Sequence, residues 1–197
     1  MDFEKDGAFS TLIKNNGVSI LLDCGINKNF DISNYEKYEE YLKKVDLILI
    51  SGSELKLCGA LIYLLDKYNF YGNVFSTLPA KYLMNVNLTL KNIFLPFEFK
   101  NRRDEIELLK SFYLLIDRVQ EIKFDEKVKL KIRNKTKVAF SAHSKGTSLG
   151  SCYYNLRIGK LKILYLIDYN FKNADSLNAI DQKVMFNEEF DFVISYL

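Results

Sequence analysis

The stretch Val18-Ser19-Ile20-Leu21-Leu22-Asp23-Cys24-Gly25 decides how this chain folds. Its first five residues are almost all apolar, which is typical of a β-strand that is buried on both faces. Asn15-Asn16-Gly17 comes just before it, and an Asn-Gly pair favours the positive φ values of a tight hairpin turn. We therefore predict a hairpin that pairs residues 9–13 with residues 18–22, followed by a polar loop that begins at Asp23.

The same pattern recurs further along the chain, where the apolar run 45–51 stops at Gly52. Around this second strand the sequence alternates between strands and helices, which is typical of a layered sheet with helices outside it. Ser33 to Glu36 resembles a capping box, and Pro79 fits the first turn of a helix. Helices are predicted over 33–44, 57–68, from Pro79 onward and over 104–115, with a short strand over 73–76.

The pattern of the sequence changes after Arg118, where predicted strands follow one another without helices between them. The predicted strands cover 121–124, 128–132, 137–141, 153–158, 162–168 and 191–197. The last of them runs to Leu197 without a following turn. We therefore expect one domain over 1–197 that forms the front part of a longer protein.

Composition narrows the class of protein. The 197 residues are 48% hydrophobic, which is enough for a real core and argues against disorder. The net charge of +3 is mildly basic and does not by itself indicate a nucleic-acid partner. Cys24, Cys58 and Cys152 are far apart, so neither a zinc ribbon nor a disulfide framework is expected. The charged N-terminus and the short apolar runs predict a soluble cytoplasmic or nuclear protein.

A strand ending in L-L-D-C-G (21–25), a strand ending in I-S (50–51), and C-G-A-L opening a helix (58–61) resemble the metallo-β-lactamase superfamily. The branch they resemble is that of the RNA-processing β-CASP proteins, and the resemblance covers nearly the whole chain, without the β-CASP insert. Weaker similarities lie in 119–124, in Asp168-Tyr169-Asn170 and in Leu177-Asn178. The resemblance implies an α/β fold of the αββα plan, a sandwich of mixed β-sheets flanked by helices.

Active members of that family hold two zinc ions with an H-x-H-x-D-H motif, a later histidine in a G-H-x-x-G loop and a bridging aspartate. In this chain only the aspartate has a counterpart, Asp168. The other ligand positions fall on Gly52, Glu54, Lys56, Leu57 and Thr147. An ammonium offers no acceptor and leucine offers only carbon, so a dinuclear zinc centre is not expected. We therefore predict no cofactor, no metal, no catalytic residue and no enzyme activity.

The carboxylates at this position still need partners, because an unpaired buried carboxylate is costly. We expect Lys56 to pair with Asp168 or Glu54 beside Asp23, in place of metal. The alternative is that Lys56 points to solvent. A different hydrolase chemistry, with one Mg²⁺ on Asp23, Glu54 and Asp168, also stays open, although the charge of Lys56 argues against it.

The resemblance further implies a nuclear, non-catalytic scaffold subunit of the pre-mRNA 3′-end cleavage and polyadenylation complex. Its expected partners are the related active zinc endonuclease, scaffold subunits of the complex and pre-mRNA, with no membrane. An inactive scaffold of the snRNA-processing complex is an alternative.

Two further features have both a functional and an ordinary explanation. Charge alternates with apolar residues over Lys127, Lys129, Lys131 and Arg133, which places the cations on one face of a strand. Such a stripe suits RNA phosphates, although a solvated edge strand is the more common reason for it. His143 is the single histidine; a nucleophilic triad would need Ser141 or Ser144 and a carboxylate such as Asp168 around it, and an incidental polar role is favoured.

Overall fold

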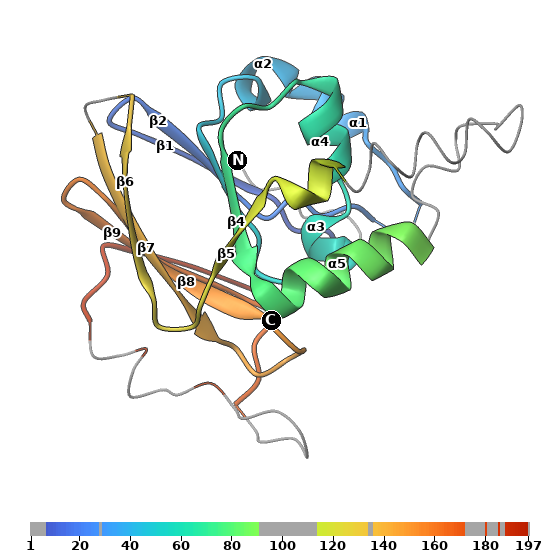
Figure 1. Ribbon diagram of the computed structural model, residues 1–197. Helices are drawn as coiled ribbons and strands as arrows, with labels where there is room; N and C mark the ends of the chain where they lie inside the picture. Colours follow the sequence, from blue (N-terminus) through green and yellow to red (C-terminus); the bar gives the residue numbers. More distant parts are fainter. Residues whose placement is uncertain are drawn as a thin grey trace, which may run out of the picture.

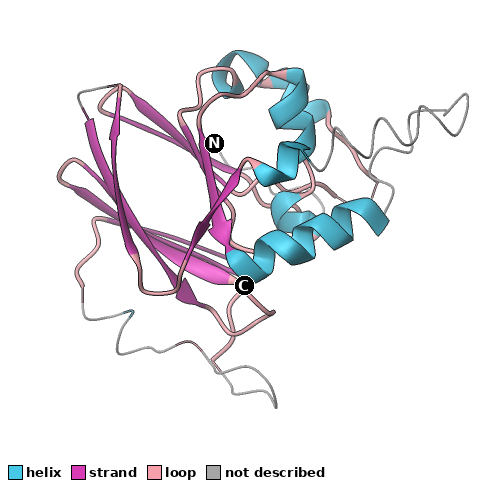
Figure 2. Ribbon diagram, in the orientation of Figure 1, coloured by secondary structure: helices cyan, strands magenta, loops and turns pink. Residues whose placement is uncertain are grey.

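The computed structural model describes residues 7–27, 29–90, 114–133, 136–171, 180, 185 and 188–196. Within them two β-sheets pack face to face, and the helices cover the outer face of the first sheet (Figures 1 and 2). No described helix is long and apolar enough to cross a lipid bilayer. The predicted α/β sandwich of mixed sheets flanked by helices is confirmed.

The first sheet is built on the stretch that opened the sequence. Its strands, in spatial order, are β1 (Thr11–Asn15), β2 (Val18–Leu22), β3 (Leu47–Leu49), β4 (Asn73–Thr77) and β5 (Val119–Ile122). β1 and β2 form the predicted hairpin, with Asn16 and Gly17 at φ values of 50° and 74°. From β2 to β5 all neighbours are parallel, so the carboxyl ends of these strands meet at one edge.

The second sheet holds most of the late strands. Its order is β10 (Phe192–Tyr196), β9 (Leu161–Ile167), β8 (Cys152–Ile158), β7 (Thr136–Ser144) and β6 (Lys127–Ile132). Only β10 and β9 are parallel, and the other pairs are antiparallel. β5 begins at Val119, two residues earlier than predicted, and β7 continues past Ser141 to Ser144, which brings His143 into the sheet.

Strand β2 explains why the layers form. Ile20 and Leu22 point into the core between the sheets, together with Phe140 and Tyr154 of the second sheet. Leu21 points the other way, into the core beneath the helices. Side chains alternate along a strand, so a strand that is apolar at every position must be covered on both faces.

The helices are more broken than the sequence predicts. They are α1 (Ser33–Lys37), α2 (Glu39–Leu42), α3 (Leu55–Cys58), α4 (Leu61–Lys67) and α5 (Leu78–Leu90). The capping box at Ser33 is wrong, because Ile32 is the N-cap and the Asp31 carboxylate accepts from the Ser33 N–H at 2.9 Å. The predicted helix 57–68 divides at Gly59, where a Cβ would lie 2.1 Å from the Ile26 side chain. Residues 104–113 of the predicted helix 104–115 lie outside the described residues, as does Leu177-Asn178.

Candidate functional site

The carboxyl ends of β2, β3 and β9 bring polar residues together. Asp23 directly follows β2, and Asp168 directly follows β9. Both have positive φ, 56° and 52°, a conformation that is uncommon for residues other than glycine. Such backbone strain persists only where surrounding contacts hold it, and it concentrates at functional sites.

Asp23 is completely buried and fully hydrogen bonded. One of its carboxylate oxygens accepts from the Ser51 N–H at 2.6 Å, and the other accepts from the Ser51 hydroxyl at 2.6 Å and the Tyr165 hydroxyl at 2.8 Å. Burial raises the pKa of Asp23 to about 6, although the charge of Lys145 and the Ser51 hydrogen bonds oppose that rise. Asp23 therefore ties β2, β3 and β9 together and has no oxygen left without a donor.

Lys145 is the residue that sequence reasoning missed. It follows β7, is only 1% exposed, and donates from Nζ to the Ile167 carbonyl at 2.9 Å. Burial lowers its pKa, against the attraction of Asp23. The one available signal was a lysine placed between Ser144 and Gly146 in a loop that follows an apolar strand.

Lys56 lies in α3, at the mouth of the same region. Its Nζ is 2.7 Å from an Asp168 carboxylate oxygen and 3.2 Å from a Glu54 carboxylate oxygen. Partial burial lowers the pKa of Lys56. The hydrogen bond to Asp168 and the charge of Glu54 together raise the pKa by more than burial lowers it, so the pKa lies above its ordinary value. The side chain thus lies among the carboxylates and is not directed to open solvent.

The other predicted ligand positions have structural roles. Gly52 lies where a Cβ would approach the Leu57 side chain to 2.7 Å, and Leu57 is fully buried between the sheets. The Thr147 hydroxyl is 3.1 Å from the Ser151 hydroxyl. Asp23 does not join the Lys56 group through a hydrogen bond, because Ser51 and Tyr165 occupy its oxygens.

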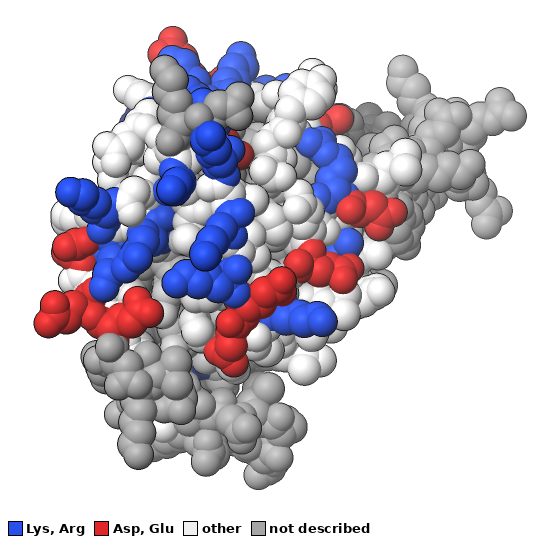
Figure 3. Space-filling model, turned by 60° about the vertical axis from the view of Figure 1, so that its left-hand side comes forward, with Lys and Arg blue, Asp and Glu red and all other residues white. Residues whose placement is uncertain are grey.

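The basic stripe lies on β6, which is the edge strand of the second sheet. Lys127, Lys129 and Lys131 are exposed and share one face. Arg133 does not continue their row: its guanidinium Nε is 2.8 Å from an Asp46 carboxylate oxygen, and a second nitrogen donates to the Lys44 carbonyl. Figure 3 shows Lys and Arg side chains gathered on the side of the molecule that it brings forward.

His143 has different neighbours from those considered in the sequence. Its Nε2 lies 2.8 Å from the Ser141 hydroxyl and its Nδ1 lies 2.6 Å from an Asp125 carboxylate oxygen. Its ring stacks on Tyr153 with centroids 5.0 Å apart. Asp125, not Asp168, therefore completes the hydrogen-bonded chain, because a turn before β6 brings Asp125 beside β7.

Known proteins resemble this chain in sequence. A family model described as a metallo-beta-lactamase superfamily domain matches residues 12–191. "Probable cleavage and polyadenylation specificity factor subunit 2" of Caenorhabditis elegans is 26% identical over 175 residues, which are 88% of this chain and 20% of that protein. "Endoribonuclease ysh1" of Schizosaccharomyces pombe is 27% identical over 176 residues, 86% of this chain and 22% of that protein. The chain thus spans about a fifth of the length of these curated relatives.

Solved structures resemble the fold. The Rm3 metallo-beta-lactamase has a TM-score of 0.56 at 15% identity, over 96% of this chain and 72% of that one. BJP-1, a subclass B3 metallo-beta-lactamase of Bradyrhizobium japonicum, has a TM-score of 0.55 at 14% identity, over 95% and 70%. At these identities the likeness is one of fold alone. With the family match, it confirms the resemblance drawn from L-L-D-C-G and C-G-A-L.

The residues present do not fit a pair of zinc ions. Zinc takes imidazole, thiolate or carboxylate ligands, and each ion needs several. In the described part of the chain, no group of three or more His, Cys, Asp or Glu side chains is arranged to hold a metal ion. Two ammonium groups, on Lys56 and Lys145, lie among the carboxylates instead. The same finding removes the support for a single Mg²⁺ on Asp23, Glu54 and Asp168.

One prediction from the sequence is contradicted, namely that the chain is not an enzyme. Relatives at 25–27% identity include proteins named endoribonuclease, and the structures that share the fold are metallo-β-lactamases, which are hydrolases. The physical error lies in the step from ligands to activity. A missing set of metal ligands bears only on the chemistry that needs those ligands, and it does not exclude chemistry by other residues of the chain.

Proposed function

This chain belongs to the metallo-β-lactamase superfamily, and from that membership we propose that it is an RNA-associated scaffold subunit of the pre-mRNA 3′-end cleavage and polyadenylation complex. Its partners there are the related zinc endonuclease, scaffold subunits and pre-mRNA, and it acts in the nucleus. The observation that carries this proposal is the match of most of the chain to a relative named for cleavage and polyadenylation.

The edge of the sheets that holds Lys56 and Lys145, at the carboxyl ends of β2, β3 and β9, supports a scaffold role. Lys56 joins α3 to the end of β9 through Asp168, and Asp23 joins β2, β3 and β9. These contacts close the edge at which metallo-β-lactamase folds place their ions, and they fix the loops of that edge relative to one another. A rigid edge of this kind suits a subunit that must present a fixed surface to its neighbours.

The lysines of β6 support association with RNA. Three exposed ammonium groups, on Lys127, Lys129 and Lys131, lie on one face of an edge strand, with no acidic partner among the described residues. Neutralising phosphates releases counterions, so binding through such a stripe weakens steeply as salt rises. Arg133 is held by Asp46 and contributes less to the stripe than the sequence predicts.

The test is affinity purification of the tagged chain from its native cell, followed by mass spectrometry. We expect the endonuclease and the other cleavage and polyadenylation subunits to be recovered. A second arm replaces Lys127, Lys129 and Lys131 together with Gln, which leaves the complex intact and reduces the RNA that is cross-linked to the chain. Recovery of an snRNA-processing complex, or of no processing subunit, would refute the assignment.

The hydrogen-bonded chain of Ser141, His143 and Asp125 favours a second candidate function, hydrolysis of esters by a serine nucleophile. Ser141 and His143 are two apart on β7 and therefore share its outer face. The Ser141 hydroxyl lies 2.8 Å from His143 Nε2, and His143 Nδ1 lies 2.6 Å from the Asp125 carboxylate. Both distances are within the hydrogen-bond range that a nucleophile, a base and an orienting carboxylate need. Asn155 lies opposite Ser141 on β8 and lines the same small hollow.

In this candidate the Ser141 hydroxyl oxygen bonds to the ester carbon while its proton passes to His143 Nε2. The alcohol then leaves with that proton as the carbon–oxygen bond breaks. Water releases the acyl group from Ser141 through the same base. The Asn155 side-chain oxygen is buried and has no hydrogen-bond partner among the described residues; in this candidate the nitrogen of the same amide is the donor to the developing oxyanion.

A fluorophosphonate probe tests the second candidate directly, because Ser141 would attack phosphorus and expel fluoride. We expect a covalent adduct on Ser141 that is lost in Ser141→Ala and in His143→Ala. Ser144→Ala is the matched control, since Ser144 lies on the same strand and points to the opposite side. Absence of the adduct in the wild-type chain would exclude this candidate.

A further inference from the structure

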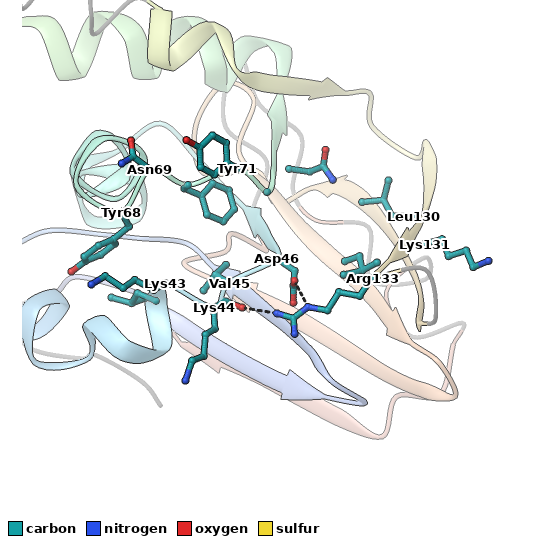
Figure 4. A pocket seen from close by; sticks show the side chains of 15 residues that line it. Lys43, Lys44, Val45, Asp46, Tyr68, Asn69, Tyr71, Leu130, Lys131 and Arg133 are labelled. Carbon is teal, nitrogen blue, oxygen red and sulfur yellow. Dashed lines mark hydrogen bonds and ion pairs between the residues drawn. The ribbon is translucent and has the colours of Figure 1, made fainter.

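A deep hollow lies away from the carboxylate edge. Its volume is about 530 Å³, within the rough range of 300–1,000 Å³ for small-molecule sites. It opens between the segment that joins α2 to β3, the segment that joins α4 to β4, and the end of β6 (Figure 4). It thus lies at the end of the stripe of Lys127, Lys129 and Lys131.

The walls of this hollow combine cations with aromatic rings. Lys43, Lys44, Lys131 and Arg133 line it, against a single acidic residue, Asp46. Asp46 is already engaged, because Arg133 and the Ser19 N–H occupy its two carboxylate oxygens. Lys43 pairs with Glu39, whereas Lys44 and Lys131 have no acidic partner in the part of the chain that the structure describes. The surface around the hollow therefore carries excess positive charge, and Figure 4 shows the Lys131 side chain directed outward from β6, away from the hollow.

Tyr71 is the unusual residue of the set. Its side chain is 90% exposed at the rim, although most large aromatic rings of a folded chain are at least half covered. Figure 4 shows it across the hollow from Arg133 and Leu130, with Tyr68 further along the same side. Arg133 is fixed there by Asp46 and by the Lys44 carbonyl, so a flat guanidinium and an exposed ring border one space.

We propose that this hollow binds a nucleotide of single-stranded RNA, with the base stacked on Tyr71 and the phosphates held by Lys44 and Lys131. Base stacking on aromatic rings and phosphate contacts to lysine are the two interactions by which proteins bind single strands. The strand continues along Lys129 and Lys127 of β6, where alternate residues are about 7 Å apart. This inference rests on the proposed RNA association and assigns it a site.

The experiment measures the binding of fluorescein-labelled oligouridylate and oligoadenylate to the whole chain by fluorescence anisotropy, over a range of salt concentrations. Stacking contributes roughly 1–3 kcal/mol per base, so we expect Tyr71→Ala to weaken binding about fivefold or more. Lys44→Gln and Lys131→Gln should each reduce the salt slope by about 0.7. Because the Tyr71 side chain is 90% exposed and buries little surface, we expect Tyr71→Ala to keep the fold.

Two matched controls separate the site from general effects. Tyr82→Ala removes another exposed tyrosine, on α5, and Lys160→Gln removes an exposed lysine in the turn between β8 and β9. Both should bind as the wild type does. A 4-thiouridine oligonucleotide should cross-link at Tyr71 when irradiated.

The outcomes separate this inference from the proposed function. If the wild type binds RNA and Tyr71→Ala binds equally well without loss of the cross-link, the nucleotide site is refuted and the RNA association stands. If the wild type does not bind at low salt, both fail, while membership of the processing complex is decided by the purification. Capture of a protein segment at Tyr71 in place of RNA would also overturn the inference.

Discussion

Replacing Lys145 with methionine should destabilise the fold in a manner that depends on pH. Lys145 is buried, its Nζ donates to the Ile167 carbonyl, and its charge opposes the rise in the pKa of Asp23. Methionine fills much of the same volume without the charge or the donor. The buried Ile167 carbonyl then loses its lysine donor, which costs about 1–3 kcal/mol at any pH.

The second part of the cost comes from Asp23. Its folded-state pKa of about 6 lies above the ordinary value of 3.8, so the folded state binds the proton more tightly than the unfolded state does. The stability that this gives is full below pH 3.8 and is lost as the pH rises to about 6, where the wild-type curve levels off. Without Lys145 the pKa rises further, so the loss continues above pH 6.

Each pKa unit by which the loss of Lys145 raises the Asp23 pKa costs up to about 1.4 kcal/mol at a pH above that raised pKa, so Lys145→Met should cost more near pH 7 than near pH 5. Urea unfolding followed by circular dichroism at both pH values measures this difference. In Asp23→Asn/Lys145→Met the pH-dependent part should vanish, and Lys160→Met is the control on an exposed lysine. An equal cost of Lys145→Met at the two pH values would refute the electrostatic coupling of Lys145 to Asp23.

Three more predictions follow from the same region. Lys56→Gln should lower the free energy of unfolding by about 1 kcal/mol or less, because the Lys56 side chain is 37% exposed, and added salt should shrink the difference measured in urea. Gly25→Ala should abolish folding or lower the melting temperature sharply, since the new Cβ would lie 1.8 Å from the Lys56 carbonyl oxygen; an unchanged melting temperature contradicts the close approach. A thiol reagent should label Cys24, Cys58 and Cys152 slowly in the native chain and fully in the unfolded chain, because these cysteines are buried and burial raises their pKa. Rapid labelling of the native chain would contradict this burial.

The sequence by itself determined the layers of this protein. A strand such as Leu47–Leu49 that is apolar at every position can be satisfied only inside a sheet covered on both faces. The Asn-Gly turn determined the first hairpin, and L-L-D-C-G with C-G-A-L was specific enough to indicate the superfamily. The residues at the ligand positions could likewise be read directly, because their spacing from those motifs is fixed along the chain.

Only the tertiary structure decided which charges meet. Lys56 and Asp168 are 112 positions apart, and their distance of 2.7 Å depends on the packing of α3 against the end of β9. The position of Lys145 in a loop after an apolar strand was only a weak signal, and Asp125 carried none, because a lysine becomes a buried counterion, and an aspartate the partner of His143, only through neighbours from other strands. Periodicity reports which face of its own element a residue occupies, whereas the pairing of side chains from distant elements is set by sheet order and by the loops at the strand ends.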